Sequence, residues 1–273
     1  MDLDVINQRG LVLLGCGKMG SAMLEGWLAQ GLRPQSVWVI DPHPSDWLVA
    51  RSGEGVVLNG DLPAAPAVVL IAVKPQMMGD ALPQIAAFGG GETVVVTVAA
   101  GTTIATYETV FGPSTRIVRA MPNTPAAVGR GITAIVGNAA ATPADLDLAE
   151  GLLSAVGQVV RLAGEHQMDA VTAVSGSGPA YVFHLIEALA SAGEAEGLPA
   201  PLAMQLARAT VTGAGELAHL APETAAQLRI NVTSPGGTTA AALSVLMDPD
   251  SGFPALLRRA VKAAADRGRE LGK

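Results

Sequence analysis

Five short runs of Val, Ile and Leu in the first 120 residues constrain the fold more than any other feature. The runs are continuous instead of alternating with polar residues, which indicates strands buried on both faces of a parallel sheet. Segments long enough for crossover helices, such as Lys18–Gln30 and Gln76–Ala87, lie between them. This repetition predicts an α/β fold with a mostly parallel sheet. The five runs are Leu11–Leu14, Val37–Ile40, Val68–Val73, Val94–Val98 and Ile117–Ala120, with possible edge strands at Gly131–Val136 and Val159–Leu162.

The pattern changes after about Glu165, where helix-like segments replace the apolar runs. Proline stands at or near several predicted starts, where its missing N–H costs nothing, and Gly197 and Gly272 occupy C′ positions. We therefore predict an α/β domain over residues 1–164 and an all-helical domain over residues 165–273. The predicted helices are Pro179–Gly197, Pro201–Leu220, Ala221–Ile230, Thr239–Met247 and Phe253–Leu271.

The composition excludes several classes of protein. Only 15% of the residues are charged, against about 25% in an average soluble domain, and the net charge is −7. A generic nucleic-acid binder would need a basic face, and no apolar run approaches the roughly 20 residues of a membrane span. One cysteine and an N-terminus without a basic region predict a cytoplasmic protein. Small residues on several helix faces suggest burial between subunits, although a compact monomeric bundle or a compositional bias towards Ala and Gly would also explain them.

The segment Gly15–Gly20 has the GxGxxG spacing of a dinucleotide-binding loop. It follows the first predicted strand and begins a helix, as that motif requires. The first glycine permits a tight turn, the second lets backbone approach a pyrophosphate, and the third allows helix and strand to pack closely. The phosphates would lie at the helix N-terminus, where free N–H groups favour an anion. Cys16 inside this loop is interpreted as a small packing residue.

Asp41 follows the second predicted strand and bears on the choice of cofactor. A carboxylate there accepts hydrogen bonds from the ribose hydroxyls and repels a 2′-phosphate, which favours NAD(H) over NADP(H). Asp41 could instead simply start the Asp41-Pro42 turn, and His43 could contact a phosphate when protonated. The residues alone therefore leave NADPH open.

Several loops at the ends of the later strands and before two of the predicted helices are candidates for ligand binding. Val73-Lys74-Pro75, Ala99-Ala100-Gly101 and Met121–Pro125 stand at strand ends, where a dinucleotide lies. In the helical half, Asn231–Thr239 places glycines and hydroxyls before a helix, which is an anion-binding arrangement with a carboxylate as natural occupant. Helix capping alone would also explain this loop and the Ser175–Pro179 loop.

At these motifs the chain resembles the pyrroline-5-carboxylate reductases, which catalyse the last step of proline biosynthesis. The resemblance rests on the glycine loop, Ala72–Pro75, Arg119–Pro125, the Ser-Gly-Ser-Gly-Pro loop and Ser234–Thr239. It implies a Rossmann domain followed by a helical dimerisation domain, with dimers often grouped into pentamers of dimers. It also implies the substrate 1-pyrroline-5-carboxylate, L-proline as product and NAD(P)H as cofactor, with no metal, nucleic acid or membrane involved.

The resemblance also implies roles for individual residues. We expect Thr239 and Thr172 to be the catalytic residues, with the Thr239 hydroxyl bonded to the ring nitrogen and Thr172 supporting the substrate pocket. We expect Ser234, with the Gly237 and Thr238 backbone, to hold the carboxylate. The expected substrate-binding residues are Glu165, Thr172, Asn231, Ser234, Gly237, Thr238 and Thr239. The expected cofactor-binding residues are Leu14, Gly15, Cys16, Gly17, Lys18, Met19, Asp41, His43, Asn59, Ala72, Val73, Lys74, Pro75 and Ala100.

Two other functions compete with this prediction. A β-hydroxyacid dehydrogenase also combines a Rossmann domain with a helical domain, but it characteristically uses a lysine of the second domain. This chain has no lysine between Lys74 and Lys262. A non-catalytic dinucleotide sensor would need no second anion site, whereas the Ser234–Thr239 loop supplies one.

Overall fold

The structure is a computed structural model, and it describes residues 3–272. Asp2, an acidic residue of the N-terminus that lacks a basic region, lies outside the described residues. The contacts between residues divide the chain into two compact units. The first contains residues up to Gly176 together with the last residues from Ala265 onwards, and the second contains Ser177–Ala264. This division by contacts does not test the domain boundary that the sequence predicts between residues 164 and 165, which stays a prediction. Within the described residues, no helix is long and apolar enough to cross a membrane.

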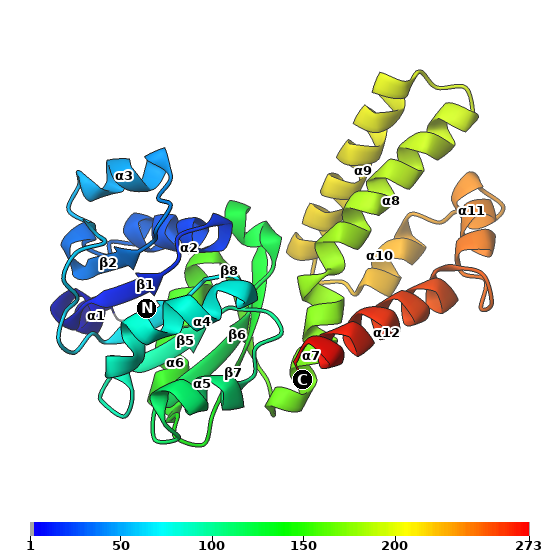
Figure 1. Cartoon of the computed structure of the whole chain (residues 1–273). Helices are drawn as coiled ribbons and strands as arrows, with labels where there is room; N and C mark the ends of the chain where they lie inside the picture. The colour runs from blue at the N-terminus through cyan, green and yellow to red at the C-terminus, as the bar shows by residue number, and fades with distance from the viewer. Residues whose placement is uncertain (1–2, 273) are drawn as a thin grey trace. The chain divides into compact units, whose positions relative to one another are not determined.

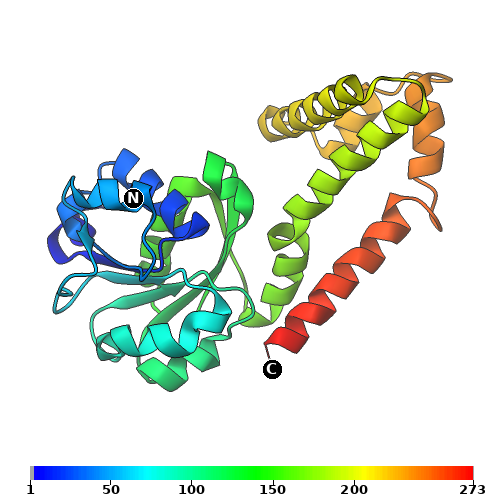
Figure 2. The same ribbon diagram turned by 45° about the horizontal axis from the view of Figure 1, so that its top comes forward.

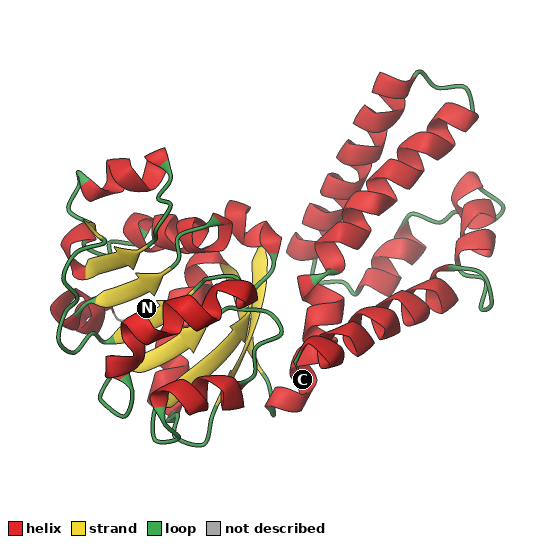
Figure 3. Cartoon of the chain, in the orientation of Figure 1, coloured by secondary structure: helices red, strands yellow, loops and turns green. Residues whose placement is uncertain are grey.

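The first unit is built on one eight-stranded sheet in the order β3-β2-β1-β4-β5-β6-β7-β8 (Figures 1 and 3). The pairs among the first six strands are parallel, β6 and β7 are antiparallel, and β8 is parallel to β7. The predicted mostly parallel sheet is therefore confirmed. The strands are β1 (Leu11–Leu14), β2 (Val37–Ile40), β3 (Val57–Leu58), β4 (Val68–Ile71), β5 (Val94–Thr97), β6 (Arg116–Met121), β7 (Gly131–Gly137) and β8 (Gly157–Arg161).

Helices cover both faces of this sheet, and two apolar cores result. Side chains alternate along each strand, so Leu11 and Leu13 enter one core while Val12 and Leu14 enter the other. The first core receives side chains from α1 (Leu3–Arg9), α2 (Lys18–Ala29), α3 (Asp46–Ser52) and α6 (Pro143–Leu153). The second core receives them from α4 (Met78–Ala81), the 3₁₀ segment Leu82–Phe88, α5 (Ile104–Phe111) and α7 (Met168–Val171). The unit is thus a three-layer α/β/α domain.

The second unit is entirely helical across Ser177–Ala264, all of which the structure describes. Two long helices, α8 and α9, contact each other and are joined by a short turn (Figure 2). Gly197 takes φ +96° at that turn, which a residue with a Cβ rarely adopts. The helices are α8 (Gly178–Ala195), α9 (Ala200–Leu220), α10 (Ala225–Asn231), α11 (Thr238–Leu246) and α12 (Phe253–Leu271), the last of which ends in the first unit.

Candidate functional site

The glycine loop between β1 and α2 has the geometry that each of its glycines requires. A Cβ on Gly15, which takes φ +87°, would lie 3.1 Å from the Ala72 backbone, and one on Gly20 would lie 2.5 Å from the Gly15 carbonyl oxygen. A Cβ on Gly17 would meet no atom within 4 Å. Gly17 is the N-cap of α2, so no capping side chain occupies the first N–H groups of this helix. Open space in front of the unpaired N–H groups of a helix start fits a pyrophosphate.

Asp41 lies directly after β2, and its carboxylate is fixed by the backbone. Oδ2 accepts a hydrogen bond from the Cys16 N–H at 2.8 Å, and Oδ1 accepts one from the His43 N–H at 2.8 Å. A carboxylate has about four acceptor sites, so capacity remains for ribose hydroxyls. The structure therefore holds an acceptor group beside the glycine loop, where the adenosine half of a dinucleotide is expected.

Asn59, a predicted cofactor contact, holds the backbone of Asp41. Its Oδ1 accepts from the Asp41 N–H at 2.9 Å, and its Nδ2 donates to the Asp41 carbonyl oxygen at 2.8 Å. Its φ of +50° is one that asparagine tolerates better than most residues. Asn59 thus fixes the position from which the Asp41 carboxylate extends.

Cys16 is buried in the loop, as expected of a packing residue. Its side chain is 4% exposed, and its Sγ lies 3.6 Å from the Ser21 hydroxyl. Burial raises the pKa of the Cys16 thiol and the nearby Asp41 charge raises it further, while the Ser21 hydrogen bond opposes both. The thiol is therefore kept protonated at neutral pH, which is unlike a nucleophilic cysteine.

The remaining predicted cofactor contacts lie at the carboxyl edge of the sheet. The backbone from Ala72 to Pro75 follows β4, and Ala100 is exposed after β5. Because the order of connection reverses between β1 and β4, the two halves of a dinucleotide would lie on the two sides of this point. Leu14, Lys18, Met19 and His43 belong to the β1–β2 side, and Val73 and Lys74 to the β4–β5 side.

Glu165 and Thr172 belong to the first unit, and both side chains already have partners. Glu165 Oε1 accepts from Arg119 Nη1 at 2.6 Å and from the Ile104 N–H at 2.8 Å. The Thr172 hydroxyl donates to the Met168 carbonyl oxygen at 2.9 Å, and Thr172 begins the π-helix Thr172–Gly176. Such π-helical turns occur frequently at functional sites.

The other predicted substrate residues surround the start of α11 in the second unit. The Gly237 N–H donates to the Ser234 carbonyl oxygen at 3.0 Å, and Gly236 takes φ +69°, so the chain turns tightly before the helix. Gly237 is the N-cap of α11 and makes no side-chain cap. The first N–H groups of α11, from Thr238 onwards, therefore lack intrahelical partners and can bind a carboxylate. Asn231 ends α10 just before this turn.

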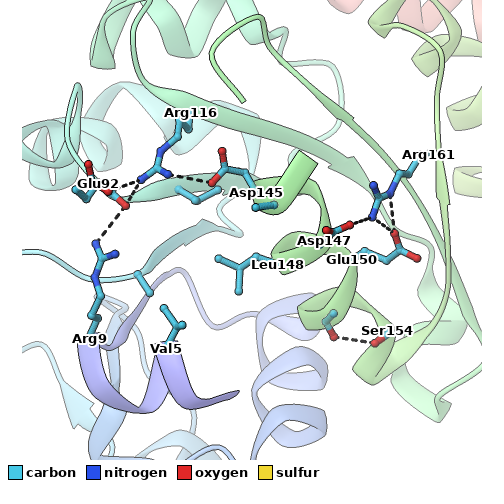
Figure 4. A pocket seen from close by; sticks show the side chains of 14 residues that line it. Val5, Arg9, Glu92, Arg116, Asp145, Asp147, Leu148, Glu150, Ser154 and Arg161 are labelled. Carbon is cyan, nitrogen blue, oxygen red and sulfur yellow. Dashed lines mark hydrogen bonds and ion pairs between the residues drawn. The ribbon is translucent and has the colours of Figure 1, made fainter. Parts of the chain in front are cut away.

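One large cavity of the first unit lies elsewhere, at the amino ends of β5 and β6 (Figure 4). Its volume is about 740 Å³, and it contains none of the predicted site residues. Its charged side chains pair with one another: Arg116 with Asp145 at 3.2 Å, and Arg161 with Asp147 and Glu150. Charges that already satisfy one another do not require a ligand, so this cavity is a poor candidate for the functional site.

The Arg119–Glu165 pair is the part of the site region that the sequence prediction missed. Arg119 is 4% exposed within β6, although charged side chains are rarely buried unless paired. An arginine inside the apolar run Ile117–Ala120 was the available signal, since it demands a buried acidic partner. Glu165 lies 46 residues further along, so its identity as that partner needed the fold.

Comparison with known proteins finds similarity along almost the whole chain. Residues 165–271 match the family model described as pyrroline-5-carboxylate reductase dimerisation. Residues 10–101 match the model described as NADP oxidoreductase, coenzyme F420-dependent. The pyrroline-5-carboxylate reductase of Synechocystis sp. is 42% identical over 96% of this chain and 98% of that protein. That of Pseudomonas aeruginosa is 38% identical over 96% and 97%.

Solved structures give the same result. A pyrroline-5-carboxylate reductase from Coxiella burnetii has a TM-score of 0.89 and 34% identity, with 97% of this chain and 99% of that chain covered. A Plasmodium falciparum pyrroline carboxylate reductase, solved with NADP bound, has a TM-score of 0.81 and 28% identity, with 98% and 99% covered.

Together, the sheet order, the glycine loop and the helical second unit define an NAD(P)-dependent oxidoreductase with a Rossmann domain. The similarity then identifies which one: the chain belongs to the pyrroline-5-carboxylate reductase family. The helical region matches the family's dimerisation domain, so the chain is a homo-oligomer. Its membership of the family makes its substrate a small molecule. The predicted fold class, family and class of enzyme are confirmed.

Proposed function

We propose that the chain carries out the reaction of its family, the reduction of 1-pyrroline-5-carboxylate to L-proline, with NADH. We also propose that its side chains align the reactants instead of supplying a strong acid or base. The observation that carries this proposal is a pair of helix starts with unpaired N–H groups. One is the open start of α2 at Gly17, and the other is the turn before α11 at Gly237. The first suits a pyrophosphate and the second a substrate carboxylate.

Alignment is sufficient because the imine carbon of the substrate is already electrophilic once its nitrogen is protonated. A reduced nicotinamide, when bound, would supply the hydride that this carbon accepts. Holding two reactants in the correct geometry is worth about 7–11 kcal/mol in favourable cases. The chain's residues therefore need only to bind, orient and exclude water.

At the substrate end, Ser234 and the backbone N–H groups of Gly237 and Thr238 hold the carboxylate. The Thr239 hydroxyl, half-buried in the first turn of α11, bonds the ring nitrogen. Asn231 borders the same turn. Thr172 supports the pocket as a hydrogen-bond acceptor, because its own proton is directed to the Met168 carbonyl oxygen.

The preference for NADH is inferred from the fixed carboxylate of Asp41. The Cys16 and His43 N–H groups hold this carboxylate beside the glycine loop, and the Asn59 side chain holds the Asp41 backbone. There the carboxylate accepts from the ribose hydroxyls and repels a 2′-phosphate. The competing candidate is NADPH, which two observations favour: the exposed His43 beside Asp41, and the NADP in the solved Plasmodium falciparum relative.

We also infer that the chain works in the cytoplasm as a pentamer of dimers. Its single cysteine is buried and unpaired, which suits a reducing compartment. The grouping into pentamers follows from the family resemblance alone. Sedimentation equilibrium would give a mass of ten chains, and a mass of two chains would reduce this inference to a dimer.

The reaction is tested by mixing the protein with 1-pyrroline-5-carboxylate and either reduced cofactor, following the loss of nicotinamide absorbance. We expect oxidation of both, faster with NADH. Thr239→Ala should lower kcat/KM at unchanged cofactor affinity, and Thr239→Ser, which keeps the hydroxyl, should restore most of it. No oxidation of either cofactor by the wild type would overturn the proposed function.

The cofactor preference is tested with Asp41→Ser, which removes the charge near the ribose. We expect the ratio of kcat/KM for NADH to that for NADPH to fall about tenfold or more, a change of about 1.4 kcal/mol. Asp46→Ser is the matched control, because Asp46 is an exposed acidic residue at the start of α3, five residues further on. Equal ratios in the wild type and Asp41→Ser would remove Asp41 from cofactor selection.

A further inference from the structure

Two buried polar clusters lie beneath the carboxyl ends of β5 and β6, and the mechanism above uses neither. One contains Arg119, which is 4% exposed on β6, and the other contains Tyr107, which is fully buried on α5. Burying a polar group costs free energy unless the group is fully paired, so a buried polar network at this edge of the sheet requires a physical explanation. Both clusters belong to the first unit.

The first cluster joins three segments through one carboxylate. Glu165 Oε1 lies 2.6 Å from Arg119 Nη1 and 2.8 Å from the backbone nitrogen of Ile104. Ile104 is the first residue of α5, where an N–H has no intrahelical partner and a negative charge is favoured. The carboxylate thus ties the end of β6 and the start of α5 to the segment that begins at Glu165.

The second cluster holds the other end of the loop between β5 and α5. The Thr97 hydroxyl, at the end of β5, donates to the Tyr107 hydroxyl oxygen at 2.6 Å and accepts from the Ala99 N–H at 3.4 Å. Burial raises the pKa of Tyr107, which keeps its hydroxyl protonated. The loop Val98–Thr103 is therefore fixed at both ends, and Ala100 is exposed between them.

The segment after Glu165 is also fixed to the end of β6. Asn123 Nδ2 donates to the Ser175 carbonyl oxygen at 3.2 Å, while its Oδ1 accepts from the Ile132 N–H at 2.9 Å. Ser175 belongs to the π-helix that begins at Thr172. In a sheet of this order the second mononucleotide half lies beyond β4, so the nicotinamide is expected on the side of these segments.

We propose that Arg119 and Glu165 are positioning residues for hydride transfer. Their ion pair holds the loop Val98–Thr103 and the π-helix Thr172–Gly176 in fixed relation at the carboxyl edge of the sheet. Glu165 then acts through Arg119 and Ile104, not as the substrate contact that the family resemblance implies. This proposal rests on the proposed function of the same site.

The size of the effect follows from the geometry of hydride transfer. Arg119 is buried, whereas the Glu165 side chain is 31% exposed. Removing the charge of Glu165 therefore leaves a buried guanidinium uncompensated, and removing Arg119 releases Glu165 from β6, so in either variant the surrounding segments rearrange. A displacement of about 1 Å between reacting groups can lower the rate about 10²-fold. Arg119→Met, which removes the charge but keeps an unbranched side chain, should approach that loss. Glu165→Gln, which keeps an acceptor oxygen, should lower the rate about tenfold, and Arg119→Lys should fall between the wild type and Arg119→Met.

The experiment measures hydride transfer in a single turnover, with enzyme in excess over reduced cofactor and saturating 1-pyrroline-5-carboxylate. The rate constant reports the geometry of the reactants, whereas the amplitude reports the fraction of folded sites. We expect the rate constant to fall in both variants while the amplitude is kept. Binding of ADP-ribose, which lacks the nicotinamide, should stay within about twofold of the wild type, because the adenosine half lies on the β1–β3 side.

Arg116→Met is the matched control, because Arg116 lies on the same strand and pairs with a buried carboxylate, Asp145, at 3.2 Å. Its pair lies at the amino edge of the sheet. It should lower Tm without changing the hydride-transfer rate constant. Two results would overturn the proposal: a rate constant in Glu165→Gln and Arg119→Met equal to that of Arg116→Met, or a raised KM for substrate at an unchanged rate constant. Absence of turnover by the wild type would instead contradict the proposed function.

Discussion

The two units differ in how they bury apolar side chains. The first encloses Trp27 and Leu11 completely in one core and Ile71 completely in the other, on the opposite side of the sheet. In Ser177–Ala264, all of which the structure describes, the buried apolar residues are the alanines Ala190, Ala203 and Ala207. Large apolar side chains there remain exposed within a single chain. They include Phe183, Leu189, Leu202, Leu206, Leu217, Leu220, Val245 and Leu257.

This difference shows where each unit gains its stability. A first unit with two cores stabilises itself, because each large side chain buried is worth about 1.5–3 kcal/mol. The second unit gains little in this way alone, and exposed apolar surface of such extent marks an interaction site. Its match to a dimerisation domain identifies the partner as another copy of the chain. The exposed apolar side chains of the second unit are therefore expected to be buried between subunits.

The largest expected effect comes from placing a charge on this apolar surface. Phe183 is 59% exposed on α8, and Phe183→Glu should prevent assembly, because in a symmetric dimer the substitution occurs twice. Loss of two buried phenylalanines at about 2–3 kcal/mol each would weaken association about 10³-fold or more. Sedimentation velocity should show monomers at micromolar concentration.

Val49→Glu provides the control for that variant. Val49 is 50% exposed on α3 in the first unit, a similar exposure in the unit that has its own cores. Its sedimentation coefficient should match that of the wild type. If Phe183→Glu kept the wild-type mass, the α8 surface would not be the subunit interface and the comparison of the two units would need another explanation.

A smaller effect is expected from truncating a side chain in the core of the first unit. Trp27 is fully buried on α2, and its Nε1 donates to the Leu152 carbonyl oxygen at 2.8 Å. Trp27→Ala should lower the free energy of unfolding of this unit by about 3–5 kcal/mol. Urea denaturation followed by circular dichroism measures it, with Val128→Ala, at a site 76% exposed, expected within about 0.5 kcal/mol of the wild type. A small loss for Trp27→Ala would show that the first unit also depends on its partners for stability.

The same contrast explains which parts of the fold the sequence predicted. The runs Leu11–Leu14 and Val37–Ile40 match β1 and β2 in both bounds. Every residue of β1 is buried, and the residues of β2 are buried or partly buried, so both strands are unbroken apolar runs. The two-residue strand β3 and helix α1 were missed, since such short elements have no measurable period. The segment Gln76–Ala87 is helical but broken into 3₁₀ and α turns, because Pro83 lacks the N–H that a continuous α-helix needs.

For the site, short-range motifs were predictable and long-range pairings were not. The roles of Gly15, Gly17 and Gly20 follow from six consecutive residues, and the structure has the close approaches that this motif requires. The support of Asp41 by Asn59 spans 18 residues and that of Arg119 by Glu165 spans 46. Sequence patterning identifies the residue that needs a partner, but only the packed fold brings that partner to it.

The smallest effect concerns Cys16, whose burial makes the stability of the first unit depend on pH. Because burial raises the pKa of this thiol, the folded state favours its neutral form. That stabilisation is complete below the pKa of an unfolded thiol, about 8.5. It is lost as the pH rises from there to the higher folded value, since the unfolded chain then releases its proton first. Stability should therefore decline modestly above pH 8.5.

The rate of alkylation by iodoacetamide measures how accessible the Cys16 thiol is in the folded protein. At mildly alkaline pH we expect Cys16 to react at least about tenfold more slowly in the folded protein than in urea, because it is both 4% exposed and mostly protonated. Phe183→Glu should leave this rate unchanged if the first unit is stable without its partners. A rate that rose with loss of assembly would instead show that the two units are energetically coupled.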